Sequence, residues 1–276
     1  DDVATARRYA FDLSIKQIML RQQQNHQLNQ QKQAMYSTAL NVMSKIYIGS
    51  ISFEARESDI KKSFENFGTI RSINMSYDHS TGNHIGFAFL EYDVPEAAVL
   101  AQDAMNGLML AGRNLKVNRT SNMPQAQPII DMITAEAAKY NRIYVASVHP
   151  DLSESDLKSV FEAFGNVKKC QLARSTTGGK GAHRGFGYIE FDSRQASQEA
   201  ISGMNMFDLG GQYLRVGRCI TPPEALHYLM PQSASALPTA SAMAAASITA
   251  KIQATEFAQV GSPLMPYTIS SPGQQR

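Results

Sequence analysis

The sequence contains little that points to covalent cross-links or to a membrane. It has no tryptophan and only two cysteines, Cys170 and Cys219, too few for a disulfide framework or a zinc site. A reducing compartment, the cytosol or the nucleus, is therefore expected. No apolar run approaches the ~20 residues of a membrane span and no signal segment opens the chain, so we expect no membrane association.

The net charge is also small. The 26 Lys and Arg residues face 24 Asp and Glu, which leaves a formal net charge of +2. Taken alone, this balance argues against a nucleic-acid-binding protein, because such proteins usually carry a basic excess. The six histidines are scattered and both cysteines are isolated, so neither a metal cluster nor a nucleophile with a partner base is evident. The sequence predicts no enzyme, no cofactor, no metal site and no small-molecule substrate.

One unit of sequence occurs twice. Residues 45–51 recur at 142–148 and residues 86–92 recur at 185–191, with two extra residues in the second copy near 178–181. The 276 residues, 43% of them hydrophobic, can build buried cores for such a repeat. Because the chain starts with Asp rather than Met, we expect it to be a fragment.

The pattern of each unit predicts the order strand, helix, strand, strand, helix, strand. The first helix has Ile60, Phe64 and Phe67 on one face and stops at a glycine, and the second helix begins near Pro95. This order predicts an α+β fold: two tandem ferredoxin-like βαββαβ domains, each a four-stranded sheet with both helices on one face. The predicted strands after the first are 71–77, 85–92 and 114–118 in the first unit and 168–174, 184–191 and 213–217 in the second.

The segments outside the repeat differ in composition. The predicted organisation is a Gln-rich helical N-terminal extension (1–44), a first domain (45–119), a linker with a short helix over 128–140 (120–141), a second domain (142–218) and an Ala-, Pro- and Ser-rich mobile tail (219–276). A transient Ala-rich helix is expected over 241–260 within that tail.

Alternation along the strands predicts three aromatic residues on the helix-free face of each sheet. Phe87 and Phe89 share their face with Glu91, a poor core residue, so this face should be the open one. Tyr47 joins them from the first strand. The same argument places Tyr144, Phe186 and Tyr188 on the open face of the second sheet. The simpler alternative, core aromatics in another register, is disfavoured by the matching parity of Glu91 and Glu190.

Exposed aromatics on adjacent strands are typical of a surface that stacks unpaired bases. Such stacking is worth roughly 1–3 kcal/mol per base, and single strands offer base faces that a duplex hides. The hexamers 46–51 and 143–148 and the octamers 85–92 and 184–191 resemble the two signatures of the RNA recognition motif family. Arg184 occupies the basic position of the octamer, where the first copy has Ile85. The resemblance implies a phosphate contact for Arg184 and puts that contact in doubt for the first domain.

A narrower resemblance covers about residues 7–260. The segments 142–149, 159–165 and 207–216, with the linker at 125–131, resemble poly(U)-binding splicing factors of the half-pint type. This resemblance implies a nuclear protein that binds uridine-rich intron tracts, helps define the 3′ splice site and works with other splicing factors. Members of that family carry a third, atypical RNA recognition motif near the C-terminus, and this chain ends before any such domain.

The remaining candidates are polar residues on the flanking strands. A solvated strand face explains them as well as RNA binding does. Asn74 and Gln171 are candidates for hydrogen bonds to a uracil edge, and Lys116, Arg119, Arg215 and Arg218 for contacts to phosphates.

Three functions follow from this pattern. The first is recognition of single-stranded uridine- or pyrimidine-rich RNA in pre-mRNA splicing, with affinity from stacking and from two linked domains rather than from charge. The second is a single-stranded DNA-binding regulator of transcription, because stacking does not read the sugar. The third is a protein-interaction adaptor of the spliceosome. Neither unit has the Arg-x-Phe element of protein-binding variants, so RNA binding is favoured.

Overall fold

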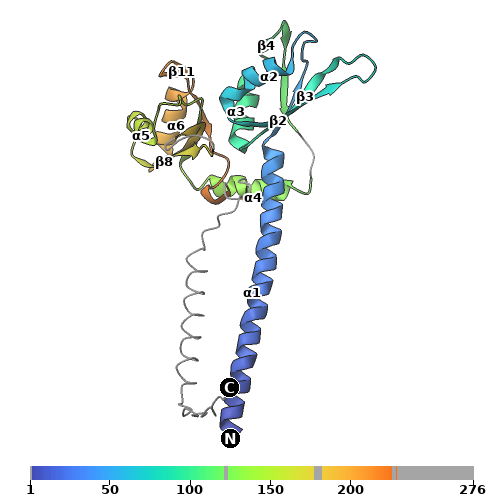
Figure 1. Cartoon of the computed structure of the whole chain (residues 1–276). Coiled ribbons are helices and arrows are strands. Elements are labelled where there is room, and N and C mark those ends of the chain that lie inside the picture. Colours follow the sequence, from blue (N-terminus) through green and yellow to red (C-terminus); the bar gives the residue numbers. More distant parts are fainter. Residues whose placement is uncertain (1, 121–123, 177–181, 226–227, 229–276) are drawn as a thin grey trace, which may run out of the picture. The chain divides into compact units, whose positions relative to one another are not determined.

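Two four-stranded antiparallel sheets carry most of the fold of this computed structural model (Figure 1), which describes residues 2–120, 124–176, 182–225 and 228. In the first repeat (residues 45–119) the strand order is β2-β3-β1-β6, and in the second (residues 142–218) it is β12-β7-β9-β8. The predicted α+β fold class is confirmed. The strands are β1 (Lys45–Gly49), β2 (Ile70–Tyr77), β3 (His84–Tyr92), β6 (Lys116–Arg119), β7 (Arg142–Ala146), β8 (Val167–Arg174), β9 (His183–Phe191) and β12 (Arg215–Arg218).

Two helices cover one face of each sheet. They are α2 (Glu57–Phe64) and α3 (Pro95–Met105) in the first repeat, and α5 (Glu154–Phe161) and α6 (Arg194–Met204) in the second. The first helix of each pair starts with a capping hydrogen bond, and the capping is reciprocal in the second repeat. In the second repeat the Ser153 amide donates to Asp156 (2.8 Å) and the Asp156 amide donates to the Ser153 hydroxyl (3.2 Å). In the first, the Arg56 amide donates to Asp59 (2.8 Å).

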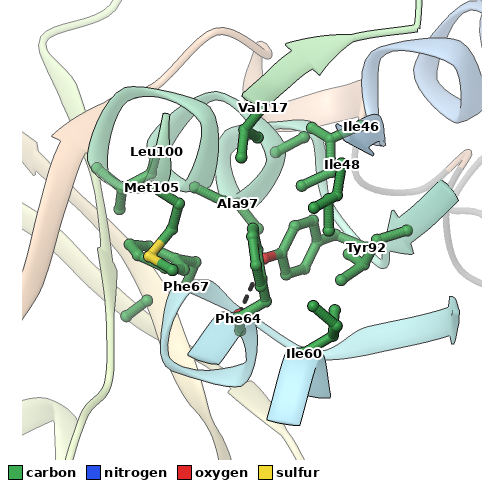
Figure 2. Packing of buried hydrophobic residues seen from close by; sticks show 14 of the residues in the cluster. Ile46, Ile48, Ile60, Phe64, Phe67, Tyr92, Ala97, Leu100, Met105 and Val117 are labelled. Carbon is green, nitrogen blue, oxygen red and sulfur yellow. Dashed lines mark hydrogen bonds between the residues drawn. The ribbon is translucent and has the colours of Figure 1, made fainter. Parts of the chain in front are cut away.

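The core of the first repeat lies between its sheet and its helices (Figure 2). Ile46 and Ile48 from β1 meet Phe64 from α2 and Tyr92 from β3, all fully buried. The Tyr92 hydroxyl donates a hydrogen bond to the Phe64 carbonyl oxygen (2.9 Å), so the apolar ring enters the core without leaving its polar end unpaired. Burial raises the pKa of Tyr92 well above its ordinary value.

A second core fills the space between sheet and helices of the second repeat. It is built from Ile143, Val145, Phe161 and Phe191, and Cys170 packs against it. Burial, more than the nearby Glu154 carboxylate, raises the pKa of the Cys170 thiol to about 11.

The predicted N-terminal helix is present as α1 (Asp2–Met43), and its last turns form a third apolar cluster. There Leu40 and Met43 pack with Ile133 of α4 (Gln127–Ala137) and with Ile220, which follows β12. Helix α4 crosses α1 near the C-terminal end of α1 (Figure 1). Helix α4 lies in the stretch where the sequence predicts the linker helix. Among the described residues, no helix has the length and apolarity to cross a membrane.

The last strand of each repeat begins later than predicted. Residues 109–110 and 113–114 instead form a small hairpin, β4 (Met109–Leu110) with β5 (Arg113–Asn114), closed by Ala111 and Gly112 at φ of 49° and 82°. Two left-handed residues are what a tight hairpin turn requires. The second repeat has the same kind of hairpin, formed by β10 (Asp208–Leu209) and β11 (Gln212–Tyr213), with two glycines in its turn. The predicted insertion loop at 178–181 and nearly all of the predicted tail, including the helix over 241–260, lie outside the described residues.

Replacing Tyr92 by Phe removes one buried hydrogen bond and leaves the Phe64 carbonyl without its partner. We expect the free energy of unfolding to fall by about 1–2 kcal/mol. Chemical denaturation of the Tyr92→Phe variant measures this change. Tyr77→Phe is the control, because that side chain is 49% exposed and should give a change near zero. Equal effects of the two substitutions would contradict the role given to the Tyr92 hydroxyl.

Candidate nucleic-acid interface

Three aromatic side chains gather on the helix-free face of the first sheet. Tyr47 on β1 is paired with Phe89 on β3, and their ring centroids lie 5.7 Å apart. Phe87 lies 5.9 Å from Tyr47 and 6.0 Å from Phe89. Phe89 is 42% exposed, and the other two are partly exposed. The three rings form an accessible apolar platform on the first sheet, as the strand alternation predicts.

Glycine at position 49 allows the Tyr47 ring to lie along the strand. A Cβ atom added at Gly49 would meet the Tyr47 hydroxyl oxygen at 2.6 Å. Any larger residue would displace the ring, so the platform depends on this close approach.

The second repeat has the same triplet in a different environment. Tyr144 lies 6.0 Å from Phe186 and 5.6 Å from Tyr188, close to the spacings in the first repeat. These three side chains are only 0%, 3% and 7% exposed, respectively. They belong to one apolar cluster with the first repeat's α3, so the second aromatic face is a packing surface in this structure.

Helix α3 makes this contact through small residues. Ala97 and Ala101 belong to the same buried cluster as Tyr144, whose hydroxyl donates to the Phe67 carbonyl oxygen at 2.6 Å. The Tyr144 side chain comes close to the backbone of Gly68, because a Cβ atom added there would meet the Tyr144 hydroxyl oxygen at 2.6 Å. Burial is the main cause that raises the pKa of Tyr144 far above its ordinary value.

A buried carboxylate, that of Glu96 on α3, anchors the contact. Its Oε2 accepts a hydrogen bond from the Tyr188 hydroxyl (3.0 Å). Its Oε1 accepts from the amides of Ile220 and Thr221 (3.0 Å each), the Thr221 hydroxyl (2.6 Å) and the Cys219 thiol (3.4 Å). A carboxylate that is 1% exposed needs such donors, because an unpaired buried charge is very costly.

Arginines of the second repeat complete the contact. Arg184 forms an ion pair with Asp93 of the first repeat and lies 5.3 Å from the centre of the Phe186 ring. Arg215 lies over the ring of Phe67, 4.9 Å from its centre. Burial lowers the pKa of both guanidinium groups, although they stay charged at neutral pH.

Comparison with known proteins identifies the repeated unit. The family described as "RNA recognition motif" matches residues 46–116 and 143–215. The chain belongs to the RNA recognition motif (RRM) family. The two repeats are therefore its first and second RRM.

Three curated relatives match beyond the two RRMs. Poly(U)-binding-splicing factor rnp-6 of Caenorhabditis elegans is 62% identical over 246 residues, covering 86% of this chain and 33% of the relative. Poly(U)-binding-splicing factor hfp of Drosophila melanogaster is 53% identical over 260 residues, covering 93% and 40%. Human poly(U)-binding-splicing factor PUF60 is 49% identical over 289 residues, covering 97% and 51%. This chain thus spans about a third to a half of these relatives' lengths.

One sequence prediction about the second RRM is wrong. Its helix-free face was expected to be uncovered, and Tyr144, Phe186 and Tyr188 are instead buried under α3 of the first RRM. Strand alternation correctly separates the two faces of a sheet, but it cannot tell which other element lies on a face. The RNA contacts predicted for these residues and for Arg184 stay predictions, and α3 would have to leave before a base could reach them.

Sequence reasoning predicted helix α3 but missed its packing on the second sheet, although the composition of the helix carries a signal. The helix is apolar nearly all round, with Ala98, Val99 and Leu100 in sequence, and such a helix is buried on more than one side. The matching positions of α6 include Gln198 and Glu199, which are exposed. A comparison of α3 with α6 would have indicated that α3 packs against a second surface.

The basic candidates on the last strands separate onto two faces. In the first RRM, Lys116 is paired with Gly49 and lies on the aromatic side, whereas Arg119 is paired with Ile46 and lies on the helix side. In the second RRM, Arg215 and Arg218 divide in the same way. Burial, together with the Arg218 charge, lowers the pKa of Arg119. Alternation alone excludes a common face for residues three positions apart, and the phosphate contacts stay a prediction.

The two amide candidates lie next to the aromatic rings. Asn74 on β2 is paired with Phe89, and Gln171 on β8 is paired with Tyr188. Both side chains are exposed. Asn74 is thus placed beside an accessible ring, and Gln171 beside a covered one.

The two triplets should respond differently to truncation. Phe186→Ala removes a ring that is 3% exposed, and the free energy of unfolding should fall by roughly 3–5 kcal/mol. Phe89→Ala removes a ring that is 42% exposed and should cost less than half as much. Denaturant titration of both variants provides the comparison. A Phe186→Ala variant as stable as the wild type would show that the second aromatic face is uncovered in solution.

The anchoring role of Glu96 can be measured through Cys219. Burial raises the pKa of this thiol, so its alkylation requires local opening. We expect Glu96→Ala to speed alkylation of Cys219 about tenfold or more, as loss of about 1.4 kcal/mol of closure would do. Rates for each cysteine come from mass spectrometry, with Cys170 in the second core as the internal reference.

The control for that experiment is Gln195→Ala, the matching position on α6, where the side chain is exposed and donates a hydrogen bond to Glu199. This variant should leave the Cys219 rate unchanged. An unchanged Cys219 rate in the Glu96→Ala variant would show that the Glu96 carboxylate does not anchor the contact.

Proposed function

We propose that this chain binds single-stranded, uridine-rich RNA through the aromatic platform of its first RRM and acts in pre-mRNA splicing, in recognition of the polypyrimidine tract at 3′ splice sites. The observation that carries the proposal is the accessible triplet of Tyr47, Phe87 and Phe89 on an open sheet. The names of the relatives, poly(U)-binding splicing factors, support the choice of ligand and process. A nuclear location and contacts with other splicing factors belong to the same proposal.

Stacking supplies most of the affinity in this mechanism. Each base that stacks on an aromatic ring gains roughly 1–3 kcal/mol, so two or three rings account for a specific complex with a flexible strand. Uridine-rich strands suit such a platform because their bases stack weakly on one another and are easily presented. Duplex RNA hides its base faces and should bind poorly.

Charge contributes less than in most nucleic-acid-binding domains. Residues 45–119 contain 8 basic and 9 acidic side chains, a net charge of −1. Lys116 lies on the aromatic side of the sheet and is the basic candidate best placed to meet a phosphate. Few counterions are released by so few contacts, so the affinity should depend only weakly on salt.

Binding by both sheets, as the sequence predicts, requires the second sheet to separate from α3. That separation exposes three aromatic rings and removes the donors from Glu96, so it must be offset by the bases gained. The first sheet needs no such rearrangement. We therefore assign the primary contact to the first RRM and a supporting role to the second.

The decisive experiment is a titration of labelled oligo-U with the Phe87→Ala/Phe89→Ala variant. Loss of two stacking partners should weaken binding about a hundredfold, which corresponds to about 1.4 kcal/mol for each ring. Fluorescence anisotropy measures the affinity, and oligo-dT in parallel tests whether the sugar matters. The outcome that contradicts the proposal is an unchanged affinity for oligo-U.

The matched control removes two exposed aromatic residues elsewhere. Tyr9 and Phe11 on α1 are 71% and 62% exposed, and the Tyr9→Ala/Phe11→Ala variant should bind oligo-U like the wild type. A similar loss in this control would mean that exposed aromatics bind the strand without regard to the sheet.

A further inference from the structure

The third strand of the first RRM has a bulge near its start. Between two successive pairs, β2 has one residue, Ser76, where β3 has three, residues 85–87. Gly86 lies within this stretch at a φ of 88°, a left-handed conformation that glycine adopts without strain. Because a bulge changes the direction of the side chains beside it, the position of Phe87 on the platform depends on the conformation of Gly86.

Two hydrogen bonds hold the backbone of Gly86. Its N–H donates to Nδ1 of the His84 ring (3.2 Å), and its carbonyl oxygen accepts from the Ile51 amide (2.9 Å). The first bond joins a side-chain acceptor to the N–H two residues later, as in an Asx turn. Nδ1 is attached to Cγ, as Oδ1 is in asparagine, so the histidine ring acts here as an asparagine side chain would.

The second RRM has the same arrangement. The Gly185 N–H donates to Nδ1 of His183 (3.0 Å), and the Gly185 carbonyl oxygen accepts from the Val148 amide (3.0 Å). Gly185 has a φ of 80°, and the next residue is Phe186, a ring of the second triplet. In both RRMs, a histidine thus holds the glycine that comes directly before an aromatic residue of the sheet.

The other nitrogen of each histidine ring is left unpaired. Because Nδ1 accepts, the neutral ring carries its proton on Nε2. Among the described residues, Nε2 of His84 and Nε2 of His183 have no hydrogen-bond partner, and both atoms are shut off from solvent. A buried donor without a partner destabilises a fold. Both RRMs keep the bond to the glycine despite this cost, which favours a role in placing the backbone over one in stabilising the fold.

We infer that His84 is a positioning residue of the aromatic platform. By accepting from the Gly86 N–H, its ring fixes the bulge, and Phe87 then lies beside the other two rings of the platform, 5.9 and 6.0 Å away. Without the acceptor, the Gly86 backbone can rotate and Phe87 loses its fixed place beside those rings. The inference rests on the proposed function, because its readout is RNA binding, and it adds a residue that acts through Phe87 rather than by touching the RNA.

The experiment separates the acceptor of His84 from its ring. Phe53 packs on that ring, with 5.8 Å between the ring centroids. His84→Phe keeps a ring beside Phe53 and removes the acceptor, whereas His84→Asn removes the ring and keeps an acceptor at the same place. We expect His84→Phe to weaken oligo-U binding about tenfold and His84→Asn to bind within about twofold of the wild type. Fluorescence anisotropy measures the affinities, and chemical denaturation checks that each variant is folded.

The effect of the substitution should act through Phe87. In the Phe87→Ala background, His84→Phe should cause no further loss of affinity, because the ring that His84 positions is already absent. A second tenfold loss in that background would overturn the positioning role. His84→Leu makes the same tests with a smaller side chain if the larger ring does not fit.

The matched control is His149→Phe, which makes the same chemical change in the loop after β7. His149 forms the same kind of bond, because its Nδ1 accepts from the Asp151 amide two residues later (3.2 Å). No aromatic residue of either triplet follows it in the loop. We expect this variant to bind oligo-U like the wild type, and a tenfold loss would contradict a role specific to the bulge in β3.

Two further results would overturn the inference and leave the proposed function standing. One is wild-type affinity in His84→Phe, with oligo-U binding that still depends on Phe87 and Phe89. The other is an equal loss in His84→Asn and His84→Phe, which would assign the effect to the packing of the ring. Absence of oligo-U binding by the wild type would instead overturn the proposed function.

Discussion

The structure depends on the burial of one aromatic sheet face against the helix of another RRM. Burying a large apolar side chain stabilises a protein by roughly 1.5–3 kcal/mol, and three such rings lie under α3. The contact also places a carboxylate out of water, and this is tolerated because Glu96 accepts five hydrogen bonds from the second RRM and the residues after it. Because α3 covers the second sheet, the first sheet is the accessible one.

Two copies of one unit thus have different uses in the same chain. The ring spacings of the two triplets are nearly the same, so the difference does not arise in the sheets. It arises in the second helices. Where α3 carries Glu96 and Leu100, α6 carries Gln195 and Glu199, which remain in solvent. Gly217 on β12 allows the same close approach, because a Cβ atom there would meet a Leu100 methyl carbon at 3.0 Å.

Much of this fold follows from local sequence. The repeat, the strand alternation and the glycine-terminated helices predict the two sheets, their helix-covered faces and the aromatic triplets. The hairpin before β6 was missed because Ala111 adopts a left-handed conformation that alanine rarely adopts. The hairpin before β12 was missed although Gly210 and Gly211 are residues typical of such a turn. The covered second face was missed for a different reason. The burial of Tyr144 depends on its contact with α3, which is distant in the sequence. The residues around Tyr144 would be the same with or without that contact, so the local sequence does not predict it.

The residues that follow β12 also contribute to the contact between α3 and the second sheet. Ile220 and Thr221 lie outside the second repeat as the sequence defines it, yet their amides hold Glu96, and Ile220 also packs beside α1 and α4. The duplicated segment therefore does not contain all the residues that bury its own aromatic face. A fragment cut at the ends of the second repeat would keep every strand and still lose its cover, and its newly exposed aromatic face would favour self-association. The cover of the second aromatic face thus comes from residues on both sides of the second repeat.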